Sequence, residues 1–205
     1  MFGYARARVQ EFLERHEADA DVQADIALLR AEHAAEVPAP NPPMASVSAF
    51  VHWLMDRDRK STGLKSLQGK IWEEGYRAGD LRGEVFPDVP PALARWRAQG
   101  RDIAIFSSGS VQAQRDLFAH STAGDLTPFI RSYFDTTTGP KTAVQSYARI
   151  AAALNRAPSD MLFLSDVVAE LDGARAAGMD TALCVRAPGE AATDGHPIIH
   201  TFDDV

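Results

Sequence analysis

Apolar residues in the first half of the chain recur at the spacing of amphipathic helices. Tyr4, Val9 and Phe12, for example, fall on one helical face. The pattern predicts helices at residues 4–16, 21–35, 46–57 and 64–78. The proline-rich run at 37–43 is compatible with neither a helix nor a central strand, so it predicts a loop. The first half is therefore predicted to be an all-helical block.

Short apolar runs alternate with helical patterns in the second half. Strands are predicted at residues 103–106, 161–164 and 182–185, with 198–202 as a candidate last strand. Helices are predicted before the first three, at 90–99, 142–155 and 167–177, the last one stopping at Gly178. Continuous apolar strands that alternate with helices are typical of a parallel sheet covered on both faces. We therefore expect an α/β domain that begins near residues 83–88.

Polar side chains accompany these runs at three places. Ser107 to Ser110 follow the first run, and Asp166 follows the second, with Glu170 four residues later. Lys141 stands at the start of the predicted helix 142–155. Ligands of open parallel sheets bind at the carboxyl ends of the strands. A hydroxyl, a lysine and a carboxylate at successive positions of this kind predict a site for a phosphate and a divalent metal ion.

Each of these clusters also has a simpler structural explanation. Ser108 or Ser110 can cap the helix that follows. Lys141 can be a surface lysine, although a lysine at a helix N-terminus opposes the macrodipole, and a bound anion would account for it. Asp166 can be an N-cap, with Glu170 on the same side of the helix by chance. Only the combination of the three clusters favours a ligand site.

Composition narrows the classes of function. Apolar residues make up 45% and charged residues 24% of the 205 residues, as in ordinary globular proteins. No apolar run is long enough for a membrane span, and the N-terminal residues lack the apolar stretch of a secretory signal. The single cysteine, Cys184, lies in an apolar run, so we expect a cytoplasmic protein without internal disulfides. A net charge of −7 argues against a nucleic-acid partner but not against a small phosphorylated metabolite.

Two other catalytic classes lack their motifs. The six histidines show no His-Glu-x-x-His spacing, and Ser107-Ser108-Gly109-Ser110 is not a Gly-x-Ser-x-Gly elbow. The sequence therefore favours neither a zinc hydrolase nor a serine hydrolase.

The order of the three clusters resembles motifs two, three and four of the haloacid dehalogenase superfamily. The amino-acid sequences of these motifs are similar to those of its enolase-phosphatase branch, also called acireductone synthase. This likeness covers nearly the whole chain and is carried by residues 71–85, 106–114, 117–126, 134–136, 139–141 and 162–167. It implies a Rossmannoid parallel sheet with an inserted all-helical cap. The expected divisions are 1–15 for the first helix at the entry to core and cap, 16–83 for the cap, and 84–205 for the phosphatase core.

The resemblance also implies roles for the candidate residues. Ser107 and Ser108 would bind the substrate phosphate, and Lys141 would neutralise it together with the developing aspartyl-phosphate. Asp166 would ligate Mg²⁺, and Glu170 would support the metal through water. The implied reaction, part of methionine salvage and hence methionine biosynthesis, enolises 2,3-diketo-5-methylthiopentyl-1-phosphate and removes its phosphate to give the acireductone. Such enzymes are often monomers.

One expected segment does not occur in this sequence. The family opens with an apolar strand ending in Asp-x-Glu-Gly-Thr, whose aspartate is the nucleophile. Residues 1–6 resemble the helix after that motif; Asp56 and Asp58 lie in a charged helical segment, and Asp203 and Asp204 lack the glycine-threonine turn. We therefore expect the nucleophile and general acid to be absent from this chain, through a start site set too far downstream or a truncated gene. Losing a central strand would remove about 8–15 kcal/mol of burial, as much as a whole domain's stability, and leave an open sheet edge.

Three functions therefore stay open. The first is an enolase-phosphatase that is inactive without the missing strand. The second is a catalytically dead relative that binds a phosphorylated metabolite or a partner chain. The third is a phosphatase of the same type for another small phosphomonoester such as phosphoglycolate, since a fold alone does not determine function.

Overall fold

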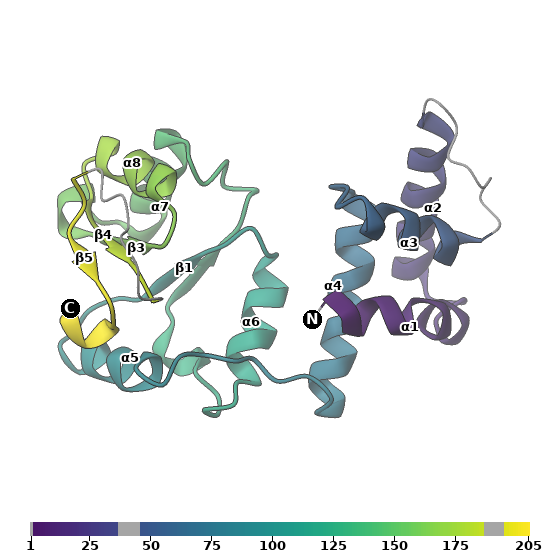
Figure 1. Cartoon of the computed structure of the whole chain (residues 1–205), viewed down its shortest axis with the longest axis horizontal. Helices are drawn as coiled ribbons and strands as arrows, with labels where there is room; N and C mark the ends of the chain where they lie inside the picture. The colour runs from purple at the N-terminus through teal and green to yellow at the C-terminus, as the bar shows by residue number, and fades with distance from the viewer. Residues whose placement is uncertain (1, 37–45, 187–194) are drawn as a thin grey trace. The chain divides into compact units, whose positions relative to one another are not determined.

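The computed structural model describes residues 2–36, 46–186 and 195–205. The chain forms two compact units that divide between Arg82 and Gly83 (Figure 1). Within the described residues, no helix has both the length and the apolar character required to cross a bilayer.

The first unit is entirely helical. It contains α1 (Phe2–Arg15), α2 (Ala20–Ala35), α3 (Val47–Asp56) and α4 (Thr62–Ala78). All four predicted helices are confirmed, whereas the predicted loop at 37–43 lies outside the described residues. Serine side chains begin two of them: Ser46 Oγ accepts from the N–H of Ala49, and Ser61 Oγ accepts from that of Leu64, both at 3.1 Å.

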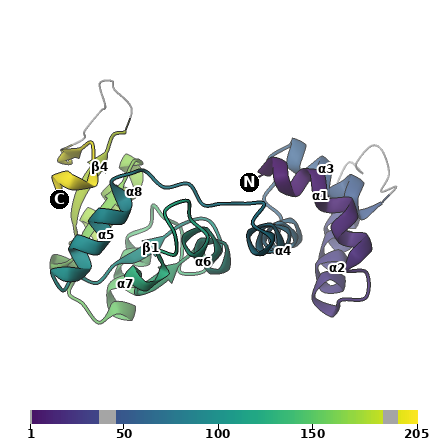
Figure 2. The same cartoon turned by 90° about the horizontal axis from the view of Figure 1, so that it is seen from below.

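Aliphatic side chains at helical spacing fill the core of this unit. Val9, Leu29, Leu54 and Leu67 are fully buried. α1 lies against α3 and α4 (Figure 2). The first helix, expected as a separate entry segment at 1–15, thus belongs to the same compact unit as the other three helices.

His16, which follows α1, joins this helix to α4 in the same unit. His16 Nδ1 lies 2.6 Å from Asp19 Oδ2, and its Nε2 lies 2.5 Å from Glu74 Oε1. The bond to Asp19, reinforced by Glu74, raises the pKa of His16 although burial opposes this. Both carboxylates therefore stabilise the charged form of His16 relative to an isolated imidazole.

The second unit alternates strands and helices. Its elements are α5 (Val89–Ala98), β1 (Ala104–Phe106), α6 (Val111–Ala119), β2 (Ser132–Phe134), α7 (Val144–Leu154), β3 (Leu162–Ser165), α8 (Val168–Ala176), β4 (Asp180–Cys184) and β5 (Ile198–Ile199). Short 3₁₀ turns lie at Thr127–Phe129, Pro158–Asp160 and Phe202–Asp204.

All strand pairs in this unit are parallel. β1 pairs with β2, placing Ile105 opposite Tyr133. β3, β4 and β5 form a second sheet in that order, with Leu164 opposite Ala182. The predicted parallel α/β fold is confirmed, but as two sheets: within the described part of the chain, no ladder joins β1 to β3.

Two strands differ from the sequence pattern. β2 was not predicted, because Ser132–Phe134 is short and not uniformly apolar. The last strand stops at Ile199 instead of continuing to residue 202. There Thr201 and Asp204 form a capping box that starts the Phe202–Asp204 turn.

Helices cover both faces of the strands. On one face, Ile105 of β1 and Leu164 of β3 pack in a cluster with Trp96 of α5. On the other, Phe106 and Phe163 pack in a cluster with Tyr147 of α7. Figure 1 shows α7 and α8 above the strands and α5 below them. β1 and β3 therefore share a core on each face, although their backbones do not pair.

A partly buried carboxylate, that of Asp88, fastens the end of the chain to the start of α5. Asp88 Oδ2 accepts hydrogen bonds from the N–H of Phe202 at 2.6 Å, from Arg186 at 2.7 Å and from the Thr201 hydroxyl at 3.1 Å. Burial by itself raises the pKa of Asp88, but these hydrogen bonds outweigh it, so the pKa of Asp88 is lowered.

Candidate active site

The serine-rich turn lies directly after the carboxyl end of β1. Its first residue is tied to β2, because the N–H of Ser107 donates to Phe134 O at 3.1 Å. Ser107 Oγ accepts from the N–H of Gly109 at 3.1 Å. Ser110 is the N-cap of α6, its hydroxyl accepting from the N–H of Ala113 at 3.2 Å. Capping thus accounts for Ser110, whereas Ser108 is exposed at the turn.

Lys141 lies in a turn that precedes α7. The helix begins at Val144, two residues later than predicted, because side chains of its first turn bind the preceding carbonyls. Ser146 Oγ donates to Pro140 O at 2.7 Å, and the Tyr147 hydroxyl donates to Lys141 O. Burial, and secondarily the charge of Glu170, raise the pKa of Tyr147 well above its ordinary value, so this hydroxyl stays protonated.

The lysine side chain reaches toward both sheets. Lys141 Nζ lies 5.9 Å from the ring centroid of Phe106, the last residue of β1. It also forms an ion pair with Glu170 Oε2 at 2.7 Å. The same carboxylate oxygen accepts from Ser165 Oγ, the last residue of β3, at 2.9 Å. Lys141 and Glu170 therefore connect the carboxyl ends of β1 and β3.

The two acidic residues do not share one helical face as expected. α8 begins at Val168, so Asp166 precedes the helix and is not its N-cap. Ser165 Oγ accepts from the N–H of Val167 at 3.1 Å, which turns the chain at this point. Asp166 is exposed, while Glu170 is 8% exposed and faces Lys141.

The donor set fits a magnesium ion only in part. Among the described residues, no group of three His, Cys, Asp or Glu side chains is arranged to hold a metal. Asp166 offers an exposed carboxylate, and magnesium needs only one or two of these together with phosphate and water. Oε2 of Glu170 is occupied by Lys141 and Ser165, so a role for Glu170 near the metal stays a prediction.

Two buried side chains around the serine-rich turn were given no role by the sequence analysis. Gln114 is 6% exposed, and its Nε2 donates to Gly109 O and Phe134 O, both at 2.9 Å. Asp135, just after β2, accepts from the N–H of Val111 at 3.2 Å and from Thr137. The sequence carried no signal for Gln114, because no residue range was predicted for the helix that follows Ser110.

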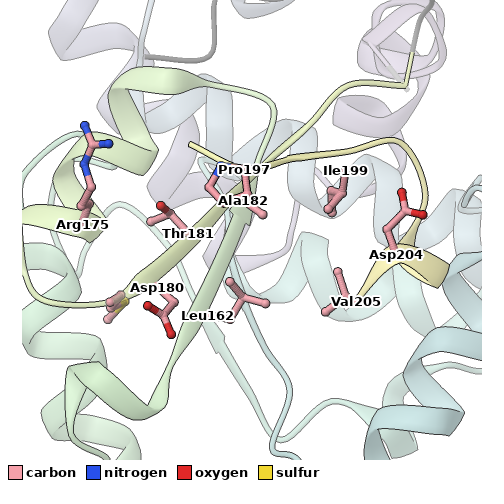
Figure 3. Close-up of a pocket in the computed structure, with 10 residues that line it drawn as sticks. Leu162, Arg175, Asp180, Thr181, Ala182, Pro197, Ile199, Asp204 and Val205 are labelled. Atoms are coloured by element: carbon pink, nitrogen blue, oxygen red, sulfur yellow. The ribbon is translucent and has the colours of Figure 1, made fainter. Parts of the chain in front are cut away.

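A hollow of about 450 Å³ lies elsewhere in the same unit (Figure 3). Leu162 and Asp180, which begin β3 and β4, contribute to its lining. Its lining contains none of Ser107, Lys141 and Asp166, so it is not part of the candidate site.

A family model for haloacid dehalogenase-like hydrolases matches residues 5–178. The chain belongs to this family. The resemblance inferred from the motifs is thereby confirmed at the level of the family.

Relatives within the haloacid dehalogenase-like hydrolases carry a more specific name. "Enolase-phosphatase E1" of Synechococcus elongatus is 53% identical over 212 residues, covering 100% of this chain and 89% of that protein. The protein of the same name from Azotobacter vinelandii is 46% identical over 202 residues, covering 98% of this chain and 86% of its own length. The crystal structure of the UTR4 protein from Saccharomyces cerevisiae superposes with a TM-score of 0.80 at 28% identity, covering 100% of this chain and 90% of that one.

Proposed function

We propose that this chain forms the helical cap and most of the core of a cytoplasmic, magnesium-dependent enolase-phosphatase of methionine salvage. Its partner would be a small phosphorylated metabolite, 2,3-diketo-5-methylthiopentyl-1-phosphate, converted to the acireductone. The observation that carries the proposal is the link from Lys141 through Glu170 to Ser165, which joins the ends of β1 and β3. The identity to proteins named Enolase-phosphatase E1 supports the choice of branch.

In this proposal each residue acts on one phosphoryl group. Ser107 and Ser108 bind its oxygens through their hydroxyl groups. The Lys141 ammonium neutralises charge on the phosphoryl group during transfer, and Glu170 holds that ammonium in place. Asp166 would hold Mg²⁺, which when bound reduces the repulsion between an anionic nucleophile and the phosphate.

The nucleophile would come from a strand upstream of Met1 that inserts between β1 and β3. Among the described residues, β1 pairs only with β2 and β3 only with β4, so each has one unpaired edge. Side chains of both strands nevertheless meet in one cluster on either face, which supports a position between them. A strand there would place an aspartate at its carboxyl end beside Ser107 and Lys141.

The experiment is a phosphate-release assay with Mg²⁺ on two chains. The 205-residue chain is expected to release no phosphate above background. The chain extended upstream by an apolar strand ending in Asp-x-Glu-Gly-Thr is expected to turn over, and Asp166→Asn in that chain is expected to remove most of the turnover. Turnover by the 205-residue chain alone would refute the assignment of the nucleophile.

The same extended chain tests the substrate. Comparing the diketo phosphate with phosphoglycolate separates an enolase-phosphatase from a phosphatase for another phosphomonoester. An extended chain that binds phosphate but hydrolyses neither compound would point to a catalytically dead relative.

A further inference from the structure

Gln114 is a polar side chain that is buried in α6. An apolar side chain at this position would bring no polar atoms that need hydrogen-bond partners. Its Oε1 has no hydrogen-bond partner within the described residues. A buried amide with an unpaired acceptor is unfavourable unless its donor group compensates. The compensating interactions of Gln114 are therefore the hydrogen bonds that its Nε2 group donates.

The Nε2 group of Gln114 donates two hydrogen bonds, one to the serine-rich turn and one to the neighbouring strand β2. One goes to the carbonyl of Gly109, within the turn, and one to the carbonyl of Phe134, at the end of β2, both at 2.9 Å. Phe134 O also accepts from the N–H of Ser107 at 3.1 Å. The Gln114 amide thus links the Gly109 end of the turn to the last residue of β2, whose carbonyl also holds Ser107.

We propose that Gln114 is a positioning residue that fixes the Ser107–Gly109 turn for binding a phosphoryl group. This inference rests on the proposed function for the identity of the ligand, but the ordering of the turn is independent of it. Gln114 touches no reacting atom and acts through the backbone of the turn. Without its two donors, the carbonyls of Gly109 and Phe134 lose partners that hold the turn, and the N–H groups of Ser107 and Gly109 exchange more freely.

The experiment measures amide hydrogen exchange by NMR in the 205-residue chain, together with binding of inorganic phosphate. Gln114→Met keeps the length of the side chain and removes both donors. Gln112→Met is the matched control, because Gln112 lies on the same helix but is exposed, and its amide nitrogen donates to Asp116 instead of to the turn. In Gln114→Met we expect exchange at Ser107 and Gly109 to rise about tenfold and the phosphate Kd to rise by a similar factor, with little change in the control.

A second variant distinguishes positioning from simple packing. In Gln114→Glu, a carboxylate faces two carbonyls at neutral pH, so the turn is expected to lose protection. When the pH falls and the buried carboxyl group gains a proton, it recovers one donor, and protection at Ser107 and Gly109 is expected to return in part. A residue that served only to fill space would show no such pH profile, and this variant also decides the question if Gln114→Met does not fold.

The outcomes separate the inference from the proposed function. Exchange at Ser107 and Gly109 within about twofold of the unmodified chain in Gln114→Met, or no recovery in Gln114→Glu at low pH, would overturn the role of Gln114. If the unmodified chain binds no phosphate, the proposed function loses its ligand, while the exchange data still decide whether Gln114 holds the turn.

Discussion

An upstream strand should convert the two sheets of the core unit into one. The perturbation is an in-frame extension that places a short apolar strand and then Asp-x-Glu-Gly-Thr before Met1. β1 contributes three residues and β3 four to their present ladders, so a strand of about five residues matches both edges. Its side chains would alternate between the Trp96 cluster and the Tyr147 cluster, which lie on opposite faces.

The size of the effect follows from what such a strand buries. About five apolar side chains contribute about 1.5–3 kcal/mol each, or about 8–15 kcal/mol in total. Ordering the backbone of five residues costs about 5–10 kcal/mol. Subtracting the ordering cost from the burial gain, the lower value from the lower and the upper from the upper, leaves about 3–5 kcal/mol. We expect the extension to raise the free energy of unfolding of the core unit by about this amount.

The assay is urea unfolding followed by the fluorescence of Trp96, which is buried in the core unit. Trp53 and Trp72, both in the helical unit, are replaced by Phe in every chain so that the signal reports on the core alone. Two controls separate folding from chemistry. An Asp→Asn change at the nucleophile should keep the added stability and abolish turnover, whereas a proline in the middle of the strand should remove both.

A rise of less than about 1 kcal/mol in the free energy of unfolding would refute the insertion of the strand between β1 and β3. Equal stability of the extended chains with and without the proline would refute it as well, because the gain would then not come from strand pairing.

Three further outcomes are expected. Glu170→Gln should destabilise the core unit by about 1–3 kcal/mol in urea unfolding, because it leaves the partly buried Lys141 without its counter-ion. The control Asp203→Asn, which breaks an exposed ion pair, should cost less than about 0.5 kcal/mol. Equal losses of stability in the two variants would contradict a special role for Glu170. Asp88 has a lowered pKa, so its contribution to stability is present above its ordinary pKa of about 4 and is lost as the pH falls through the pKa of the folded state. The difference in the free energy of unfolding between the unmodified chain and Asp88→Asn should therefore shrink below about pH 4. His16 has a raised pKa, so its contribution to the stability of the folded protein is complete below about pH 6.5 and is lost as the pH rises through the pKa of the folded state. NMR titration of the His16 ring should give a midpoint above about 6.5, and this midpoint should fall in Asp19→Asn.

Hydrophobic periodicity predicted most of the elements because the helices and longer strands are driven by burial of one face. The four helices of the first unit and the parallel strands β3 and β4 follow this rule. β2 escaped prediction because Ser132–Phe134 is only three residues long and is placed by pairing with β1, a contact distant in sequence. The division of the strands into two sheets was likewise invisible, since periodicity says nothing about which edges pair.

The candidate site was predictable as a set of residues but not as a geometry. Ser107, Lys141 and Asp166 were selected by their positions near strand ends. Their surroundings depend on two helix starts that the sequence placed differently: α7 begins at Val144 and α8 at Val168. The sequence could not show that Glu170 pairs with Lys141, because this contact joins two segments that are distant along the chain.

In the proposed enzyme, stability and catalysis depend on the same strand. Among the described residues, β1 and β3 each have one unpaired edge, and the proposed strand with its aspartate would lie there, between the two shared clusters. Lys141 and Glu170 already bridge the ends of β1 and β3, so they can hold part of the site together before that strand pairs. A change that weakens the strand should therefore reduce turnover and core stability in parallel, whereas a change at Lys141 should reduce turnover far more than stability.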